Sequence, residues 1–256
     1  MNCLFSTKKW AAVFVAVLAF FSGSAAAEDL SILCTLPLES LGNGMVNVYK
    51  AQTSQDVKIT ISTGAIVRDR IRKGEKFDIV ITTRDVIEGW AASGQLAKGN
   101  ATGIGKIGYG LGIRKGYPKL DISTVDGFKN ALRGAKSIGG SEGSVALGYL
   151  ETLLRDLGLA EELKSRTKVF ARGTFPKWLI NGEADMVVSF ISEFIYLKDN
   201  VDYAGPLPKE LQSYVEFHAG IGAESTKKEQ AIKFLQFANS PSVDSLFMST
   251  GVDRIR

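Results

Sequence analysis

Two stretches of the chain nearly repeat each other, and this repeat constrains the fold more than any other feature. Residues 74–82 read GEKFDIVIT, and residues 182–189 read GEADMVVS. Each stretch opens with a glycine, which suits the left-handed position just beyond the end of a helix. Each then continues as an apolar run without polar alternation, as a strand buried on both faces does. The repeat therefore predicts a helix–glycine–strand unit built twice, in two separate bodies.

The rest of the chain keeps the same rhythm of strands and helices. Apolar patterns predict strands at 29–35, 57–62, 107–114 and 214–221. Residues 98–106 are rich in glycine and polar residues and are predicted to be a loop. Parallel strands need crossover connections, which helices usually supply. The expected fold is α/β with two lobes, each a mostly parallel sheet flanked by helices, and with a ligand cleft between the lobes.

The two lobes are predicted to be discontinuous in sequence. Lobe 1 is expected to take residues 28–112, lobe 2 residues 113–218, and residues 219–256 are expected to return to lobe 1. In open α/β sheets, ligands bind beyond the carboxyl ends of the strands. Thr82 and Ser189 end the two repeated strands, one in each body. This arrangement indicates that a small molecule is held between the lobes. The alternative is that the repeat is a common helix–glycine–strand pattern of α/β proteins without a binding role.

The first residues of the chain predict a cleaved secretory signal. Lys8 and Lys9 precede an apolar segment at 10–21, and three alanines at 25–27 form a small-residue cleavage site. The apolar segment is shorter than the ~20 residues that a membrane-spanning helix needs. We therefore expect residues 1–27 to be removed and the protein to be periplasmic.

Charge and composition argue against several classes of function. The chain carries 31 Lys and Arg against 27 Asp and Glu, a balance that gives no support for a nucleic-acid partner. His218 is the only histidine, and Cys34 is the only cysteine beyond the predicted signal. One histidine and one cysteine offer few ligands for a zinc site and few partners for a Ser/His or Cys/His catalytic pair. No metal, cofactor or catalytic residue is predicted, and Cys34 is expected to be a small buried apolar side chain.

Anion binding is predicted at three turns that lead from a strand end into a helix. The first turn of a helix binds anions because its N–H groups are unpaired and the helix dipole favours negative charge. The predicted ligand residues of these turns are Thr35, Leu36, Thr63, Gly64, Ser141, Gly143 and Ser144. The alternative for Thr63, Ser141 and Ser144 is plain N-capping, which is at least as common and which one hydroxyl can combine with ligand binding.

Three further residues complete the predicted ligand site. Arg172 follows a predicted strand and precedes a helix, and its guanidinium can pair with a carboxylate through two hydrogen bonds. A solvated surface position is nevertheless the default for any arginine. Ser189 and Ser192 bracket the end of the second repeated strand. Glu193 beside them is expected either to cap a helix or, if it points inward, to repel anions.

Several short motifs, in a fixed order along the chain, carry a resemblance to a known family. They are ISTGA at 61–65, FDIVI at 77–81, STVDGF at 123–128, KSI at 136–138, SEGS at 141–144, Ser192-Glu193 and GPLP at 205–208. The chain resembles the type II periplasmic solute-binding proteins of ABC importers, in the branch of the molybdate-binding proteins. The resemblance implies a monomer whose two α/β lobes close on a small ligand, which is delivered to a membrane permease without catalysis.

The resemblance also bears on the identity of the ligand. Relatives that bind molybdate hold the oxyanion with serine hydroxyls, helix N–H groups and a tyrosine hydroxyl. In this chain Pro37, Gly64 or Ala65, and Phe190 stand at the corresponding places. The three missing hydroxyls favour a different small anion, such as an organic acid, over molybdate.

Two other functions stay open at the level of sequence. An exported enzyme, such as a dehydratase or lyase acting on a small acid, needs a general acid and a general base in the cleft. Glu142 and Glu193 are the carboxyls available for that purpose. A ligand sensor that docks on a membrane receptor would share every feature of a transport protein.

Overall fold

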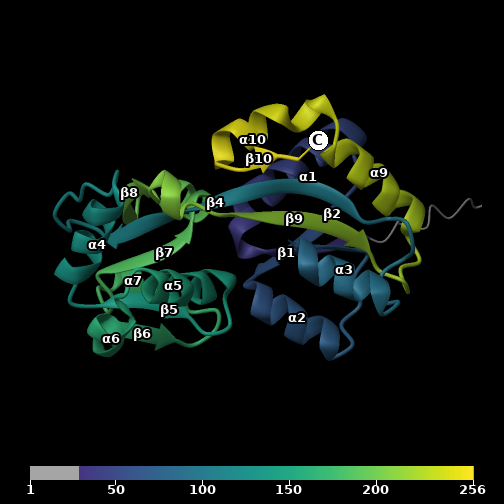
Figure 1. Cartoon of the computed structure of the whole chain (residues 1–256). Coiled ribbons are helices and arrows are strands. Elements are labelled where there is room, and N and C mark those ends of the chain that lie inside the picture. The colour runs from purple at the N-terminus through teal and green to yellow at the C-terminus, as the bar shows by residue number, and fades with distance from the viewer. Residues whose placement is uncertain (1–28, 256) are drawn as a thin grey trace, which may run out of the picture.

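The structure, a computed structural model, describes residues 29–255, so the predicted signal peptide lies outside the described residues. Figure 1 shows two α/β bodies, one on each side of the middle of the long strand β4 (Thr102–Arg114). Strand pairing changes along β4: its first half pairs with β9 (Tyr214–Ile221), and from Tyr109 onward it pairs with β7 (Met186–Phe190). The two-lobed α/β fold predicted from the sequence is confirmed.

Lobe 1 is a sheet with helices on both faces. Its strands, in sheet order, are β2 (Val57–Ser62), β1 (Leu30–Thr35), β3 (Ile79–Thr83), β9 and the first half of β4, with β10 (Asp253–Arg254) also on β4. One face is covered by α1 (Glu39–Thr53), α9 (Lys228–Ala238) and α10 (Asp244–Thr250), and the other by α2 (Gly64–Arg72) and α3 (Arg84–Ala92). Successive β1 side chains serve the two faces: Ile32 belongs to the main apolar core, and Leu33 to the cluster under α2 and α3.

Lobe 2 follows the same plan with its own strands. They are the second half of β4, β7, β5 (Ile138–Ser141) and β6 (Thr167–Phe170), with β8 (Val201–Pro206) on the other side of β4. Its helices are α4 (Val125–Gly134), α5 (Val145–Asp156), α6 (Ala160–Leu163), α7 (Lys177–Ile180) and α8 (Ile191–Tyr196). In both lobes three parallel strands lie outermost, β2-β1-β3 and β6-β5-β7, and an antiparallel strand, β9 or β4, joins them to the centre.

The repeated stretches end helical turns and begin strands, as the sequence predicts. Gly74 and Gly182 have φ angles of +86° and +74°, in the left-handed region that favours glycine. The aspartates that precede β3 and β7, Asp78 and Asp185, are both buried. Each carboxylate accepts a backbone N–H hydrogen bond of 2.8 Å from the segment of the neighbouring parallel strand. The repeat therefore fixes two strands in equivalent ways, one in each lobe.

The loop predicted at 98–106 is wrong from Thr102 onward, where β4 begins. The glycines that indicated a loop serve close strand packing instead. A Cβ atom at Gly105 would lie 2.6 Å from Val252 and 2.8 Å from the backbone oxygen of Asp253 in β10. A larger residue would therefore push β10 off the sheet.

The lobe boundaries expected at residues 112 and 218 stay a prediction. The expected cap of α4 is confirmed, because the Thr124 hydroxyl accepts a hydrogen bond from the backbone of Gly127. Within residues 29–255, no helix combines the length and the apolar character needed to cross a bilayer. The same residues contain no group of three or more His, Cys, Asp or Glu placed to hold a metal ion.

Candidate ligand-binding cleft

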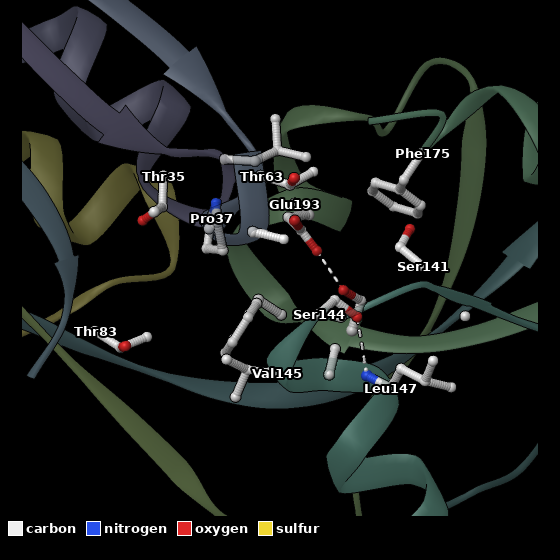
Figure 2. Close-up of a pocket in the computed structure, with 18 of the residues that line it drawn as sticks. Thr35, Pro37, Thr63, Thr83, Ser141, Ser144, Val145, Leu147, Phe175 and Glu193 are labelled. Atoms are coloured by element: carbon white, nitrogen blue, oxygen red, sulfur yellow. Dashed lines mark hydrogen bonds between the residues drawn. The ribbon is translucent and has the colours of Figure 1, made fainter. Parts of the chain in front are cut away.

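A cavity of about 60 Å³ lies between the lobes, at the carboxyl ends of β1, β3, β5 and β7. Ligands bind at such strand ends in open α/β sheets, and a space of this size holds a few water molecules or a small solute. Figure 2 shows side chains from both lobes directed into it. Eight of the ten predicted ligand residues line the cavity: Thr35, Leu36, Thr63, Gly64, Ser141, Gly143, Ser144 and Ser189.

The N-termini of α2 and α5 face the cavity from opposite lobes. The hydroxyls of Thr63 and Ser144 cap these helices by accepting the backbone N–H groups of Ile66 and Leu147, at 3.4 and 3.1 Å. The N-capping alternative is thus confirmed for both residues. Between each cap residue and the amide that it accepts lie two further first-turn amides, which a helix leaves unpaired. They belong to Gly64, Ala65, Val145 and Ala146, and all four residues line the cavity.

Buried polar side chains without a partner surround the same space. The hydroxyls of Thr35, Thr82 and Thr83 and the indole Nε1 of Trp178 are buried and find no hydrogen-bond partner among the described residues. All four residues line the cavity. A buried polar group without a partner costs about 1–3 kcal/mol. A ligand that accepts or donates hydrogen bonds here would remove that cost.

Glu193 is the carboxyl residue that lines the cavity, and its side chain is directed into it in Figure 2. The residue is only 7% exposed. The Ser189 hydroxyl donates a hydrogen bond to its Oε2 atom. Burial raises the pKa of Glu193 to about 7, and the charge of Glu39 adds to the rise, whereas hydrogen bonds from Ser189 and from the Phe190 backbone oppose it. A substantial fraction of Glu193 is therefore neutral near pH 7.

Aromatic rings are a large part of the cavity lining. Phe175, Trp178, Phe190 and Phe217 line it. The Trp178 ring stacks on Phe170 with 4.5 Å between the ring centroids, and Phe190 meets Phe217 edge to face at 5.6 Å. These rings give the carbon skeleton of a ligand an apolar surface.

Arg172 and Ser192 do not line the cavity. Arg172 lies at its mouth, where Nη1 is 2.9 Å from Asp69 Oδ2 and Nε is 3.5 Å from Glu142 Oε2. Arg172 thus lies between two carboxylates and outside the lining of the cavity that it was predicted to reach. Ser192 donates a 2.6 Å hydrogen bond to the backbone oxygen of Pro37 and so links α8 to the first turn after β1.

The predicted ligand residues leave out several residues that line the cavity. Thr82 is recognisable as a strand end, but Thr83 also faces the space because α3 begins directly after β3 with Thr83 as its N-cap. Arg68 lies one turn into α2 and donates a 3.3 Å hydrogen bond to the Gly143 backbone oxygen across the mouth. Trp178 follows the helical spacing of a core residue, and it is buried as that spacing predicts while also lining the cavity.

The comparison with protein families decides the identity of the chain. The family described as bacterial extracellular solute-binding protein matches residues 37–253. The chain belongs to this family. Among curated proteins, this solute-binding protein is similar to aconitate isomerase from Pseudomonas sp., at 23% identity over 190 residues that cover 74% of this chain and 72% of the relative.

Solved structures of periplasmic binding proteins share the fold. The periplasmic molybdate-binding protein of Azotobacter vinelandii matches with a TM-score of 0.71 and 16% identity, covering 89% of this chain and 100% of the other. Peb3 from Campylobacter jejuni matches with a TM-score of 0.69 and 15% identity over the same shares, and PEB3 bound to L-phospholactate with a TM-score of 0.70 and 14% identity. At these identities the likeness shows the fold. The resemblance to type II periplasmic solute-binding proteins is confirmed.

Proposed function

We propose that this protein captures a small anion between its lobes in the periplasm and delivers it to the permease of an ABC-type importer. The first turns of α2 and α5 carry the proposal, because both helices present unpaired N–H groups to one cavity. Two helix dipoles that point their positive ends at the same space favour negative charge there. A ligand held by both sets of donors stabilises the closed state over the open one.

A small organic acid fits the cavity better than a bare oxyanion. The helix amides and threonine hydroxyls supply donors, and aromatic rings supply apolar surface in the same cavity. An organic acid uses both surfaces, since its carboxylate takes the donors and its carbon skeleton packs on the rings. An oxyanion such as molybdate has no apolar part to place against Trp178 and Phe190. The similarity to aconitate isomerase and to the L-phospholactate complex of PEB3 agrees with an organic acid.

A ligand screen is the first test. The purified protein is examined by thermal shift against molybdate, sulfate, phosphate, citrate, phospholactate and trans-aconitate. A ligand present at a hundred times its Kd stabilises the folded state by about 2.7 kcal/mol, which raises the melting temperature by several degrees. A shift with an organic acid supports the proposal, a shift with molybdate alone overturns the choice of ligand class, and no shift with any anion overturns anion binding.

Proline at the first helical position then tests the two helix ends. Proline is tolerated there because its fixed φ suits a helix and its missing N–H belongs to the unpaired set. Val145→Pro and Gly64→Pro each remove one N–H from the cavity, and the preceding Ser144 and Thr63 already have the extended backbone that proline requires. We expect each variant to bind the anion about tenfold to a hundredfold more weakly, since a hydrogen bond to a charged group contributes about 1.5–3 kcal/mol.

Val125→Pro is the matched control for these variants. It makes the same change at the first position of α4, behind an equally extended Thr124, and Val125 does not line the cavity. Calorimetry should give the wild-type affinity for this control. Equal affinities in all three variants would contradict a role for the α2 and α5 amides.

A second candidate function is proton transfer on a bound unsaturated acid. Glu193 favours it, because a buried carboxyl beside the ligand with a pKa near 7 is what general acid or base catalysis requires. The similarity to aconitate isomerase points in the same direction. Incubation with cis-aconitate, followed by proton NMR for the trans isomer, tests it. Turnover that is lost in Glu193→Gln would establish an enzyme, and binding without turnover would leave the transport function alone.

A further inference from the structure

Glu193 separates the ligand cavity from a second, smaller recess. That recess has a volume of about 40 Å³. Glu39 of α1 and Tyr196 of α8 line it together with apolar residues such as Pro37 and Leu197. Glu193 lines both spaces, and Phe175 lies between them. Glu193 therefore borders both the ligand cavity and this recess.

No cation in the described part of the chain pairs with Glu193 to balance a negative charge. None of the ion pairs formed among residues 29–255 includes it, although Arg68 lines the same cavity at the mouth. The titratable groups that face it are Glu39 on α1 and Tyr109 on β4, and the Ser189 hydroxyl on β7 is its hydrogen-bond donor. Glu39 and Tyr109 supply no positive charge. A carboxylate in this place would oppose the anion that the two helix dipoles attract.

We propose that Glu193 is a neutral carboxylic acid when the ligand is bound, and that it donates a hydrogen bond to an anionic oxygen of the ligand. The anion then binds together with one proton. This inference rests on the proposed function of the cavity and deepens it, because it makes Glu193 a specificity determinant for ligands with a carboxylate or similar acceptor. A cation would instead select the ionised form of Glu193.

The recess brings a second carboxyl, that of Glu39, to a space that Glu193 also lines. Glu39 is half-buried, burial raises its pKa, and a hydrogen bond with Tyr196 opposes that rise. The raised pKa of Glu193 itself, to about 7, agrees with a proton held at neutral pH, and a bound anion favours that neutral form further.

Isothermal titration calorimetry tests the proposal with trans-aconitate, and with phospholactate as a second probe, between about pH 6.5 and pH 9, where the carboxylates of both probes are ionised. Above pH 7 the affinity should fall about tenfold for each pH unit, because one proton must be taken up. Titrations of the wild-type protein at about pH 8.5, in two buffers of different ionisation enthalpy, should show uptake of nearly one proton per ligand, because free Glu193 is mostly ionised there. This readout needs no variant.

Glu193→Gln keeps a hydrogen-bond donor that does not titrate, so its affinity should change little with pH. Glu162→Gln, an exposed carboxyl paired with Arg133 in lobe 2, is the control and should keep the wild-type slope. Anion binding without proton uptake, or a wild-type slope in Glu193→Gln, would overturn this inference and leave the proposed function standing. Failure of both probes and of every other anion in the screen, at any pH, would overturn the proposed function and this inference with it.

Discussion

The interior of the cleft and its mouth handle charge in opposite ways. The interior offers helix amides, threonine hydroxyls and a buried carboxyl, and the positive character there comes from fixed backbone dipoles. The mouth consists of Arg68, Asp69, Glu142 and Arg172. Here Arg172 pairs with the carboxylates of Asp69 and Glu142, and Arg68 bonds the Gly143 backbone of the other lobe. The interior is therefore suited to recognise a ligand, and the mouth to hold the lobes together.

Exposure explains why the two regions should differ in strength. The Arg172 and Asp69 side chains are 40% and 29% exposed, and Glu142 is 58% exposed. Ion pairs that contact water contribute about 0–1 kcal/mol. Hydrogen bonds inside the cavity are shielded from water and cost more when they are lost. Substitutions in the interior should therefore have large effects, and those at the mouth small ones.

The largest effect is expected from Glu193 on stability. Its pKa is about 7 in the folded protein against 4.5 for an ordinary glutamate, so between these pH values the native state holds a proton that the unfolded state has lost. The unfolding free energy should therefore fall as pH rises from about 4.5 to about 7, by about 3 kcal/mol in total, and level off above. Glu193→Gln should lose this part of the pH dependence, which urea unfolding at about pH 5 and pH 8 measures.

The same control serves this experiment. Glu162→Gln should keep the wild-type difference between the two pH values, because that carboxyl is 41% exposed. If Glu193→Gln and the wild type show the same difference, Glu193 is ionised in the folded protein, and the interior is more polar than its burial indicates.

A smaller effect is expected at the threonine hydroxyls. Thr35→Val replaces a buried hydroxyl that has no partner with a methyl group of the same shape. The unfolding free energy without ligand should stay the same or rise, whereas ligand affinity should fall about fivefold, which corresponds to about 1 kcal/mol. Thr35→Ser keeps the hydroxyl and should restore the affinity. Parallel losses of stability and affinity in Thr35→Val would indicate that the hydroxyl serves the fold and not the ligand.

The fold was predictable because its signals are local. The repeated glycines set the helix ends, and the apolar runs after them set two strands, without reference to any distant residue. The prediction of a loop at 98–106 was wrong because the contacts that decide the structure there are not local. Whether Gly105 lies in a turn or under β10 depends on Val252 and Asp253, which are remote in sequence.

The candidate site was predictable only for residues whose position is set by the neighbouring sequence. Thr63 and Ser144 follow strands and precede helices, so their position at the cleft follows from the strand–turn–helix pattern. The environment of Arg172 depends on Asp69, which lies 103 positions away. The burial of Glu193 depends likewise on packing by both lobes. A sequence read in isolation identifies the turns that hold donors but not the partners that neutralise a charge.

Arg172→Ala is expected to have the smallest effect and tests the contrast most directly. We expect at most about a threefold loss of affinity, since the exposed pair with Asp69 contributes about 0–1 kcal/mol. The loss should appear as faster ligand release, because the pair joins the lobes, and it should shrink at high salt. Asp69→Asn should match it, and the double variant should be no weaker than either single one. A hundredfold loss in Arg172→Ala with an unchanged Asp69→Asn would mean that Arg172 leaves its carboxylates to bind the ligand, and the distinction between interior and mouth would then fail.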